Sequence, residues 1–550
     1  MKQRLELTWI GKGEEDVLEP RILIENPEYS YGSTDTGNLL IHGDNLLALK
    51  SLVASGYAGK VKCIYIDPPY NTGSAFEHYD DNVEHSIWLS LMYCRIQLLH
   101  ELLAEDGVLC IHLDDIEVHY AKVITDEVFR RENFVCTVAI KSSTPSGLKT
   151  THKDKTIIKQ KDLMLVYRKS DKLRINPTYI SRGSWDSHFS KMLNKETLEI
   201  RNLLDVLIEE GIVAEGTTNN NIQLTQKLRA FYQKHKDEIY QTQPVMPDEH
   251  KRKSQEMAGR VYSYEDENGN ANYALNGRRF SFLSSSMAIL EDGEQDLANL
   301  LCDLWSDIDF QNTQNEGGIS FPAGKKPEKL IFRILNLFTN KGDLVLDSFL
   351  GSGTTAAVAH KMGRRYIGIE LGDHAYTHCV PRLKKVIDGT DQGGITASTG
   401  WAGGGGYRFY ELAPTLLNED ENGVMVISSE YNAEMLAAAM ALHEGFRYAP
   451  DAEVFWKQGH STESDYIYTT TQHLTIETLE YIDSLLGEGE TLLICCTSHT
   501  AGLGSRFPRI TVKRIPRMLL GRCAFDPAKS YDLNIITLPE VEPQDEDDDE

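Results

Sequence analysis

The sequence predicts an α/β fold in which one sheet is built from two segments of the chain separated by a long insertion, with a second α/β domain near the C-terminal end. Short apolar runs typical of buried strands alternate with helical patterns over residues 39–167. The alternation is lost from about residue 170 and resumes near Lys326. A chain of 550 residues has room for two to four domains, so an inserted domain fits the length.

The first segment carries the clearest pattern of strands and helices. Its expected strands are continuous apolar runs of four to eight residues, and its expected helices repeat apolar residues at helical spacing. Gly107 ends the second helical pattern. The expected strands are residues 39–42, 61–67, 108–113 and 163–167, and the expected helices are residues 45–53 and 87–103.

The insertion and the C-terminal region are less regular. The insertion has a polar helical segment at residues 195–212 and a Tyr- and Gly-rich stretch at 261–280, and a later glycine cluster at 403–406 predicts a hinge. The expected domains are an N-terminal arm (1–36), two halves of one sheet domain (37–170 and 316–392), the insertion (171–315), a C-terminal interaction domain (393–538) and a disordered acidic tail (539–550).

Residues 64–70 join an apolar strand to the sequence Asp67-Pro68-Pro69-Tyr70. The carboxylate of Asp67 and the carbonyl of Pro68 can both accept hydrogen bonds from an exocyclic amine, and Tyr70 can stack on the ring that carries it. Pro-Pro-Tyr also occurs in linkers and polyproline ligands, but there the flanking sequence is polar or proline-rich. The apolar run before Asp67 therefore favours a binding corner for a flat amine.

A second motif follows the apolar run 344–346, where Asp347 and Phe349 precede the turn Gly351-Ser-Gly353-Thr354. A strand, a glycine turn and a helix in this order let the backbone approach a nucleoside cofactor closely. The third glycine of the dinucleotide pattern and the Gly-Lys-Ser/Thr of a phosphate loop are both absent from the sequence, which disfavours a pyrophosphate ligand. Glu370 ends the next strand pattern about 20 residues on, where a carboxylate can accept from ribose hydroxyls.

The order of these two motifs resembles the beta class of amino-methyltransferases. Within that class, the run Asn38 to Leu49, the Asp-Pro-Pro-Tyr motif with the following Asn71-Thr72-Gly73, and residues 515–523 are similar to the modification subunits of type III restriction-modification systems. The resemblance implies a Rossmann-like methyltransferase sheet with circularly permuted motif order. It also implies that the insertion is a target-recognition domain.

The resemblance assigns roles to individual residues, with S-adenosyl-L-methionine as cofactor. Asp67, Pro68, Pro69 and Tyr70 would hold the target amine of a flipped-out base. Asp44 matches the family's contact to the adenine amine of the cofactor, although an acid at this position equally suits a helix N-cap. The remaining implied cofactor residues are Asp347 for the methionine end, Phe349 under the adenine, Gly351, Gly353 and Thr354 for backbone approach, Glu370 for the ribose, and Phe321, Lys326 and Pro327 in a further cofactor segment.

The expected reaction is methyl transfer to adenine N6 in double-stranded DNA, as the modification and recognition subunit of a restriction complex. Alternatives are a solitary DNA adenine methyltransferase, a methyltransferase of another phage-defence system, an RNA adenine methyltransferase, and a recognition scaffold without activity. Cytosine-N4 transfer uses a similar amine pocket, but serine is commoner there at the position of Asp67. The resemblance further implies a homodimer and allows a restriction subunit that carries helicase and nuclease functions; the recognition sequence and the methylated strand cannot be read from the residues.

Composition constrains the setting and the DNA-binding surface. The net charge of −26 disfavours DNA binding through the overall field, so cations must be segregated. Basic residues outnumber acidic ones between Lys141 and Lys195, which is typical either of a phosphate-contacting surface or of a solvated helix face. Nine widely spaced cysteines favour reduced core thiols, and the pair His374 and His378 has no third ligand at metal spacing. We expect a soluble cytoplasmic protein without membrane span, signal peptide or metal.

Overall fold

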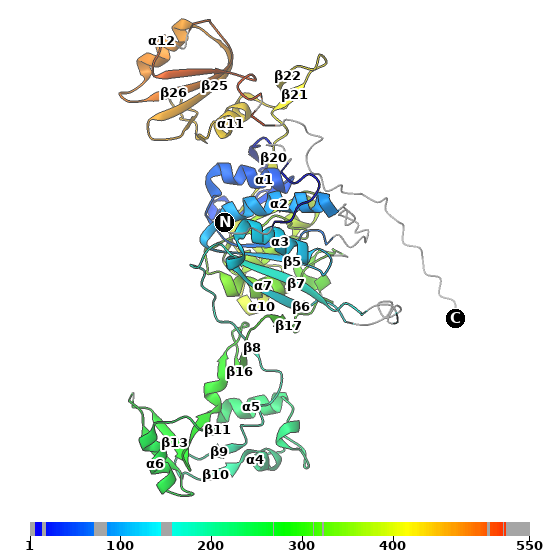
Figure 1. Cartoon of the computed structure of the whole chain (residues 1–550), viewed down its shortest axis with the longest axis vertical. Helices are drawn as coiled ribbons and strands as arrows, with labels where there is room; N and C mark the ends of the chain where they lie inside the picture. Colours follow the sequence, from blue (N-terminus) through cyan, green and yellow to red (C-terminus); the bar gives the residue numbers. More distant parts are fainter. Residues whose placement is uncertain are drawn as a thin grey trace, which may run out of the picture. The chain divides into compact units, whose positions relative to one another are not determined.

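The structure is a computed structural model, shown in Figure 1. It describes residues 6–13, 18–70, 85–144, 154, 157–267, 269–311, 313–321, 324–502, 506–520 and 522–523. The chain divides into two compact units, one formed by Met1–Asn176 with Asp303–Glu550 and the other by Pro177–Cys302. The predicted Asn71-Thr72-Gly73 segment and the predicted acidic tail lie outside the described residues.

The first unit is organised around an eleven-stranded mixed sheet with the order β1-β20-β3-β19-β18-β4-β5-β7-β6-β17, to which β2 adds by pairing with β20. Adjacent strands from β20 to β5 are parallel, whereas β7 runs antiparallel to both β5 and β6. The strands are β1 Leu23–Glu25, β2 Tyr31–Gly32, β3 Leu39–His42, β4 Val61–Ile66, β5 Leu103–Leu113, β6 Phe134–Lys141, β7 Lys161–Arg168, β17 Leu304–Trp305, β18 Leu344–Asp347, β19 Arg365–Glu370 and β20 Gly406–Leu412.

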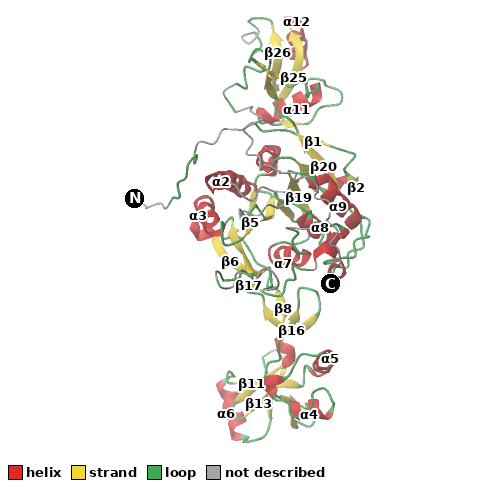
Figure 2. Cartoon of the chain, turned by 90° about the vertical axis from the view of Figure 1, so that its right-hand side faces the viewer, coloured by secondary structure: helices red, strands yellow, loops and turns green. Residues whose placement is uncertain are grey.

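Helices cover both faces of this sheet. Figure 2 shows α2 and α3 on one side of it and α7, α8 and α9 on the other. The helices are α1 Asn45–Leu52, α2 His85–Leu102, α3 Val118–Phe129, α7 Glu328–Phe338, α8 Thr354–Lys361, α9 Val380–Ile387 and α10 Thr396–Thr399, with short turns η1 Thr34–Thr36, η2 Val53–Tyr57, η3 Arg131–Asn133, η7 Thr313–Gly318 and η8 Ala375–Cys379. Apolar residues of β3, β4, β5, β18 and β19 form one buried core with α1, α2 and α3, so the sheet is a rigid base for the loops at its edges.

The predicted strands and helices of this unit are confirmed, and several strands were not predicted. The run 344–347 is β18, and 39–42 is β3, because continuous apolar runs become strands buried on both faces. By contrast, β1 and β20 pair across almost 400 residues of sequence, and β6 has a mixed burial pattern near the edge of the sheet. Strands of this kind are difficult to recognise from the local sequence pattern.

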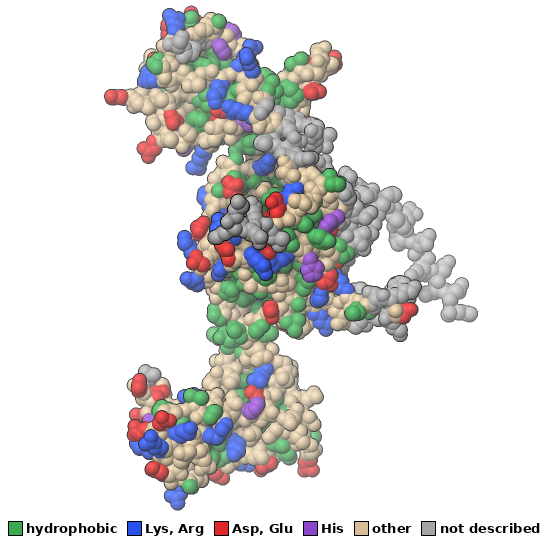
Figure 3. Space-filling model, viewed as in Figure 1, with side chains coloured by type: hydrophobic (Ala, Val, Ile, Leu, Met, Phe, Trp, Pro, Cys, Tyr) green, Lys and Arg blue, Asp and Glu red, His purple; other side chains and the backbone are tan. Residues whose placement is uncertain are grey.

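The second unit has its own strands, helices and apolar core around Trp185, Phe189 and Tyr232. Its elements are β8 Tyr179–Ser181, β9 Lys191–Leu193, β10 Ile200–Asn202, α4 Leu203–Glu209, η5 Asn219–Asn221, α5 Gln226–His235, β11 Ile239–Gln243, α6 Asp248–Glu256, β12 Tyr262–Glu265, β13 Ala271–Leu275, β14 Arg278–Phe282, η6 Leu283–Ser286, β15 Met287–Ile289 and β16 Gln295–Leu300. On the face shown in Figure 3, its basic and acidic side chains are interspersed.

The prediction of one helix over residues 195–212 is wrong. The helix α4 begins at Leu203, because the side chain of Asn202 caps it by accepting from the backbone N–H of Leu204. Before it, the Asn194 side chain accepts from the backbone N–H groups of Glu196 and Thr197 and forms a turn. The Tyr- and Gly-rich stretch 261–280, which carried no regular pattern, contributes β12, β13 and part of β14.

Residues beyond β20 form a smaller α/β region with a five-stranded sheet in the order β23-β24-β25-β26-β27. Its elements are β21 Leu417–Glu419, β22 Met425–Ile427, α11 Ala433–His443, β23 Arg447–Tyr448, β24 Gly459–His460, β25 Asp465–Leu474, α12 Ile476–Leu485, β26 Thr491–His499 and β27 Ile510–Arg514. Among the helices that the structure describes, none combines the length and the apolar character needed to cross a bilayer.

The large sheet extends beyond the predicted domain boundaries. Strand β17 at residues 304–305 belongs to the large sheet, although the insertion was expected to continue to residue 315. Strand β20 belongs to the same sheet, although the C-terminal domain was expected to begin at residue 393. The expected N-terminal arm contributes β1 and β2 to the same sheet edge through pairing with β20.

Candidate active site

The two sequence motifs meet at one edge of the large sheet. Strand β4 leads into Asp67, its parallel neighbour β18 ends at Asp347, and the next parallel strand β19 ends at Glu370. The carboxyl ends of adjacent parallel strands lie at the same edge of a sheet, and ligands of open α/β sheets bind there. The chain segments separated by the insertion are therefore brought together by strand order.

Asp67 is held by a lysine from the far side of the insertion. The Lys326 ammonium lies 2.5 Å from Asp67 Oδ2, and the two side chains are only 13% and 18% exposed. The same ammonium lies 5.0 Å from the centre of the Tyr70 ring. Asp67 Oδ1 is buried and has no hydrogen-bond partner among the described residues. One oxygen of the catalytic candidate is thus fixed by a cation and the other is available as an acceptor.

A buried polar network lies behind Tyr70. His112 contacts the Tyr65 hydroxyl at 2.9 Å and Asp162 at 3.6 Å, and Lys159 lies 3.2 Å from Asp162. Burial alone would raise the pKa of Asp162, but His112, Lys326 and Lys159 together hold it well below its usual range. Lys159 also lies 5.9 Å from the Tyr70 ring centre. The ring that would stack on a base is therefore surrounded by fixed charges of both signs.

A core side chain also holds the corner at residues 67–70 through a hydrogen bond. The indole N–H of Trp88 donates to the carbonyl of Pro69 at 2.9 Å, and Trp88 itself is buried in the core. Burial, with the charges of Asp67 and Asp162, raises the pKa of the Tyr70 phenol well above its ordinary value. Tyr70 therefore remains a neutral aromatic surface at physiological pH.

The glycine turn leaves open space where a side chain would otherwise stand. Gly351 has φ 55°, and a Cβ placed there would meet no atom within 4 Å. Gly353 has φ 78° and would bring a Cβ within 3.3 Å of Cys379. Both glycines occupy the left-handed region that glycine favours, and Gly351 faces the space that a cofactor would need.

Glu370 fixes this turn through its carboxylate. It accepts from the backbone N–H of Gly351 at 2.6 Å and from that of Gly372 at 3.0 Å. Each oxygen thus accepts from one backbone N–H, and His374 Nδ1 lies 3.9 Å from Oε1. The predicted ribose contact is compatible with this arrangement, while the observed role of Glu370 is to hold the glycine turn against β19.

Asp347 is a buried acid at the end of β18. Burial raises its pKa to about 7, and the charges of Asp67 and Glu370 act in the same direction. Hydrogen bonds from the Thr355 hydroxyl at 2.6 Å and from the Phe349 backbone N–H at 2.9 Å oppose that shift. Strongly perturbed acids at a sheet edge indicate a functional site.

Asp44 caps α1, as one of its two predicted roles requires. Its side chain accepts from the backbone N–H of Leu47 at 3.0 Å and lies 3.1 Å from the buried Arg95 guanidinium. The neighbouring Asn45 donates to the Ser348 carbonyl at 2.6 Å and accepts from Arg95 at 2.5 Å. Asn45 therefore ties the first motif directly to the strand end that precedes the glycine turn.

A buried ionic cluster supports the glycine turn from below. Thr354 accepts from Arg382 at 2.7 Å, and Arg382 pairs with Glu328 at 2.8 Å. Lys361 also pairs with Glu328, at 2.8 Å. The predicted contact role of Thr354 thus coexists with a structural one, because its side chain is buried and hydrogen-bonded within the protein.

The other predicted cofactor residues occupy neighbouring positions. Phe321 is buried, and its ring lies edge-on to His374 and His378 at 5.4 and 5.2 Å between ring centres. Pro327 is the N-cap of α7, and Phe349 packs partly buried on the core. Among the residues that the structure describes, no group of three potential metal ligands is found.

Sequence reasoning missed the residues that connect the motifs. Asn45, Arg95, His112 and Asp162 were not identified as site residues, because each acts through a partner distant in sequence. The available signals were a buried arginine within an apolar helix and a histidine within the apolar run 108–113. Polar residues in such runs need a partner inside the protein.

The chain is similar to DNA methylases over much of its length. The DNA methylase model of the N6/N4 methyltransferase family matches residues 61–380, more than half of the chain. The probable type III restriction-modification enzyme HindVI Mod subunit of Haemophilus influenzae is 37% identical over 69% of this chain and 54% of its own length. The EcoP15I Mod subunit of Escherichia coli is 29% identical over 44% of this chain and 39% of its own.

The EcoPI Mod subunit of Escherichia phage P1 is 27% identical over 65% of this chain and 61% of its own length. The chain thus spans about half the length of these curated relatives. The matched residues include β4 with the Asp67 corner, the inserted unit, the glycine turn and Glu370. On this match, the chain belongs to the N6/N4 DNA methylase family.

Proposed function

We propose that this chain transfers the methyl group of S-adenosyl-L-methionine to the N6 amine of an adenine flipped out of double-stranded DNA. The observation that carries the proposal is the placement of Asp67, with one buried free acceptor oxygen, beside Tyr70 and next to the Gly351 turn on adjacent strand ends. The acceptors, the stacking surface and the open turn are the three parts that this chemistry needs.

The residues present fit the cofactor. Gly351 leaves open space beside the strand ends, and Asp347 and Glu370 line the same edge. Phe349, Asp44, Thr354 and Phe321 would complete the pocket for the nucleoside. When bound, the cofactor supplies an electrophilic methyl group on a sulfonium.

The chain's own contribution is to orient and activate the amine. The lone pair of an adenine amine is delocalised into the ring, so hydrogen bonds from its two N–H groups to Asp67 Oδ1 and the Pro68 carbonyl would favour a tetrahedral nitrogen. These acceptors also stabilise the positive charge that develops on nitrogen in the transition state. Fixed orientation of the amine supplies up to about 7–11 kcal/mol in favourable cases, while Tyr70 stacking partly offsets the cost of base flipping.

We further propose that the chain acts as the modification and recognition subunit of a type III restriction-modification system. Three relatives that carry this description support it. In this assignment the inserted unit reads the DNA sequence, the protein forms a homodimer, and a separate restriction subunit supplies helicase and nuclease functions. A solitary methyltransferase has the same chemistry without the nuclease partner.

Long-read modification mapping of DNA from cells that express the chain tests both parts. The expected result is N6-methyladenine at one asymmetric motif, lost with Asp67→Ala. Methylated cytosines or a mark on RNA alone would refute the adenine assignment. Purification from the native host with its neighbouring gene products then separates a restriction complex from a solitary enzyme.

A further inference from the structure

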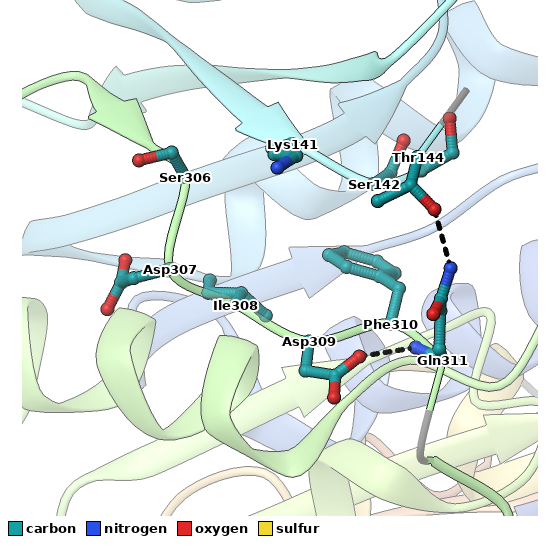
Figure 4. Close-up of a pocket in the computed structure, with 10 residues that line it drawn as sticks. Lys141, Ser142, Thr144, Ser306, Asp307, Ile308, Asp309, Phe310 and Gln311 are labelled. Atoms are coloured by element: carbon teal, nitrogen blue, oxygen red, sulfur yellow. Dashed lines mark hydrogen bonds between the residues drawn. The ribbon is translucent and has the colours of Figure 1, made fainter. Parts of the chain in front are cut away.

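A cavity lies at the same sheet edge, away from Asp67. It has a volume of about 250 Å³ and is lined by residues 141–144, which follow β6, and by residues 306–311, which follow β17 (Figure 4). Strands β6 and β17 are parallel to each other and run in the same direction as β4. The strand order places the cavity three spacings from β4, roughly 14 Å at about 4.8 Å per strand.

Among the described residues that line the cavity, Lys141 is the one cation, and Asp307 and Asp309 are the acids. Lys141 is exposed, and it forms no ion pair with any residue in the described ranges. The nearby Asp307 is neutralised by Arg333 at 2.7 Å and Lys329 at 3.1 Å, which hold its pKa well below the usual range despite burial. Asp309 accepts from the backbone N–H of Gln311, and in Figure 4 its carboxylate turns away from the wall that carries Lys141.

The remaining lining suits part of a nucleic-acid strand. The Phe310 ring is half-buried on the wall that faces Ser142, and the Gln311 amide donates to the Thr144 hydroxyl at 2.7 Å across the opening. Pockets for whole small molecules measure about 300–1,000 Å³, so this cavity suits one unit of a longer ligand. A lysine with hydroxyl groups is typical of phosphate contacts, and an aromatic ring beside them is typical of base stacking.

The cavity is mechanically linked to the candidate active site. The backbone N–H groups of Ser142 and Ser143 both donate to the Gln160 carbonyl, at 3.0 and 3.3 Å. The Ser143 hydroxyl donates to the Lys159 carbonyl at 3.0 Å, and the Lys159 ammonium faces the Tyr70 ring. One short segment before β7 therefore supports both the cavity wall and the stacking ring.

We propose that this cavity holds one further nucleotide of the methylated DNA strand, with its phosphate on Lys141 and its base against Phe310. The proposal rests on the proposed function and adds a second contact to it. A separation of roughly 14 Å corresponds to about four nucleotides at about 3.4 Å each, and to fewer where the strand is unstacked. The bound nucleotide therefore lies within about four positions of the flipped adenine.

A scan with neutral methylphosphonates tests the phosphate contact. Duplexes carry the methylated motif with one methylphosphonate at each position around the adenine, and binding is measured at several salt concentrations. The wild-type chain is expected to lose affinity at one position within about four nucleotides of the adenine. In the Lys141→Ala variant, a methylphosphonate at that position is expected to cause no further loss of affinity. The slope of log affinity against log salt concentration is expected to become smaller in magnitude by about one. Phe310→Ala is expected to weaken binding about fivefold or more with an unchanged salt slope.

The matched control is Lys341→Ala, because Lys341 is an exposed lysine in the turn before β18, at the opposite edge of the sheet. It should retain both the penalty and the salt slope. If Lys141→Ala keeps the position-specific penalty, or loses affinity equally at every position, the cavity does not hold a nucleotide. If the wild-type chain methylates no DNA at all, the proposed function itself has failed, which is a distinct result.

Discussion

At the scale of single residues, Asp347 would couple the proposed cofactor pocket to pH. Its pKa of about 7 arises from burial and from the neighbouring charges of Asp67 and Glu370. Because the folded pKa lies above the unfolded value of about 4, the stability that this group contributes is present at low pH. It is lost as the pH rises from about 4 to about 7. Without a ligand, burial favours the protonated form of the Asp347 carboxyl. A positively charged ligand favours the ionised form instead.

This linkage predicts that the affinity for S-adenosyl-L-methionine increases between pH 6 and pH 8. Below the pKa of Asp347 the dissociation constant should rise up to about tenfold per pH unit, since binding must release a proton. The Asp347→Asn variant should bind weakly with little pH dependence in this range. Calorimetric titration in buffers of different ionisation enthalpy measures both the affinity and the released proton. A wild-type affinity that is flat across this range would contradict the coupling.

Lys326 gives a second prediction at this scale. Its ammonium holds Asp67 Oδ2 and leaves Oδ1 for the amine. Replacement by methionine removes the cation from a mostly buried carboxylate, so we expect Lys326→Met to lower kcat about tenfold or more. Lys326→Arg keeps a cation and should retain more activity. An equal or higher kcat for Lys326→Met in single-turnover assays would instead mean that the lysine only obstructs the amine site.

At the scale of elements, we expect a substitution in the glycine turn between β18 and α8 to affect cofactor binding more than folding. An alanine at Gly351 meets open space but adopts a positive φ, which costs about 1–2 kcal/mol. We expect Gly351→Ala to weaken cofactor binding strongly while the fold persists. Thermal unfolding and cofactor titration of the same sample measure the two effects. Gly363→Ala is the matched control for backbone strain, because Gly363 precedes β19 with a similar positive φ and an added Cβ there would lie no closer than 3.7 Å to the Lys341 side chain.

Elements differ in how far their sequences predict them. The apolar runs of β3, β4 and β18 were predicted closely, because a strand buried on both faces is apolar throughout. Strands β1 and β20 were not predicted as part of the sheet, because their pairing joins the two ends of the domain. The helix expected at residues 195–212 was too long, because caps and turns at Asn194 and Asn202 override helical spacing.

The same limit applies to the candidate site. The acids at strand ends and the glycine turn were recognisable locally, because residue type and position carry the signal. The pairing of Lys326 with Asp67 and of His112 with Asp162 was not, because both depend on which strands become neighbours. The described basic residues from Lys141 to Arg174 do not form one surface, because β7 runs from one edge of the sheet to the opposite edge. Arg168 and Lys172 contact Glu132 and Glu105 at the opposite edge from Lys159.

At the scale of the whole molecule, the inserted residues Pro177–Cys302 form a compact unit of their own. Its two ends meet the first unit at Asn176, which donates to the Leu337 carbonyl at 2.8 Å, and at Asp303, whose carbonyl accepts from Ala139 at 2.8 Å. Deletion of residues 177–302 with a short linker should therefore keep the sheet and cofactor binding. We expect loss of motif-specific methylation, because base contacts provide specificity. Calorimetry and modification mapping of the shortened chain measure these outcomes, and motif-specific methylation by it would contradict the assigned role of the insertion.

The net charge of −26 constrains where the proposed DNA substrate could bind. An acidic protein binds DNA only where cations are concentrated, and its binding should weaken steeply with salt. Lys141, Lys159 and Lys161 are placed at the sheet edge that carries Asp67 and Tyr70. DNA is thus expected to approach the molecule along this edge.

Asp67, Tyr70 and the glycine turn are proposed to form one site for methylating adenine. The most direct measurement uses DNA incubated with the purified chain and S-adenosyl-L-methionine labelled on its methyl group, followed by digestion to nucleosides. We expect label in N6-methyldeoxyadenosine with the wild-type chain and none with Asp67→Ala, while both proteins bind the cofactor. Label in deoxycytidine, or equal labelling by the two proteins, would contradict it.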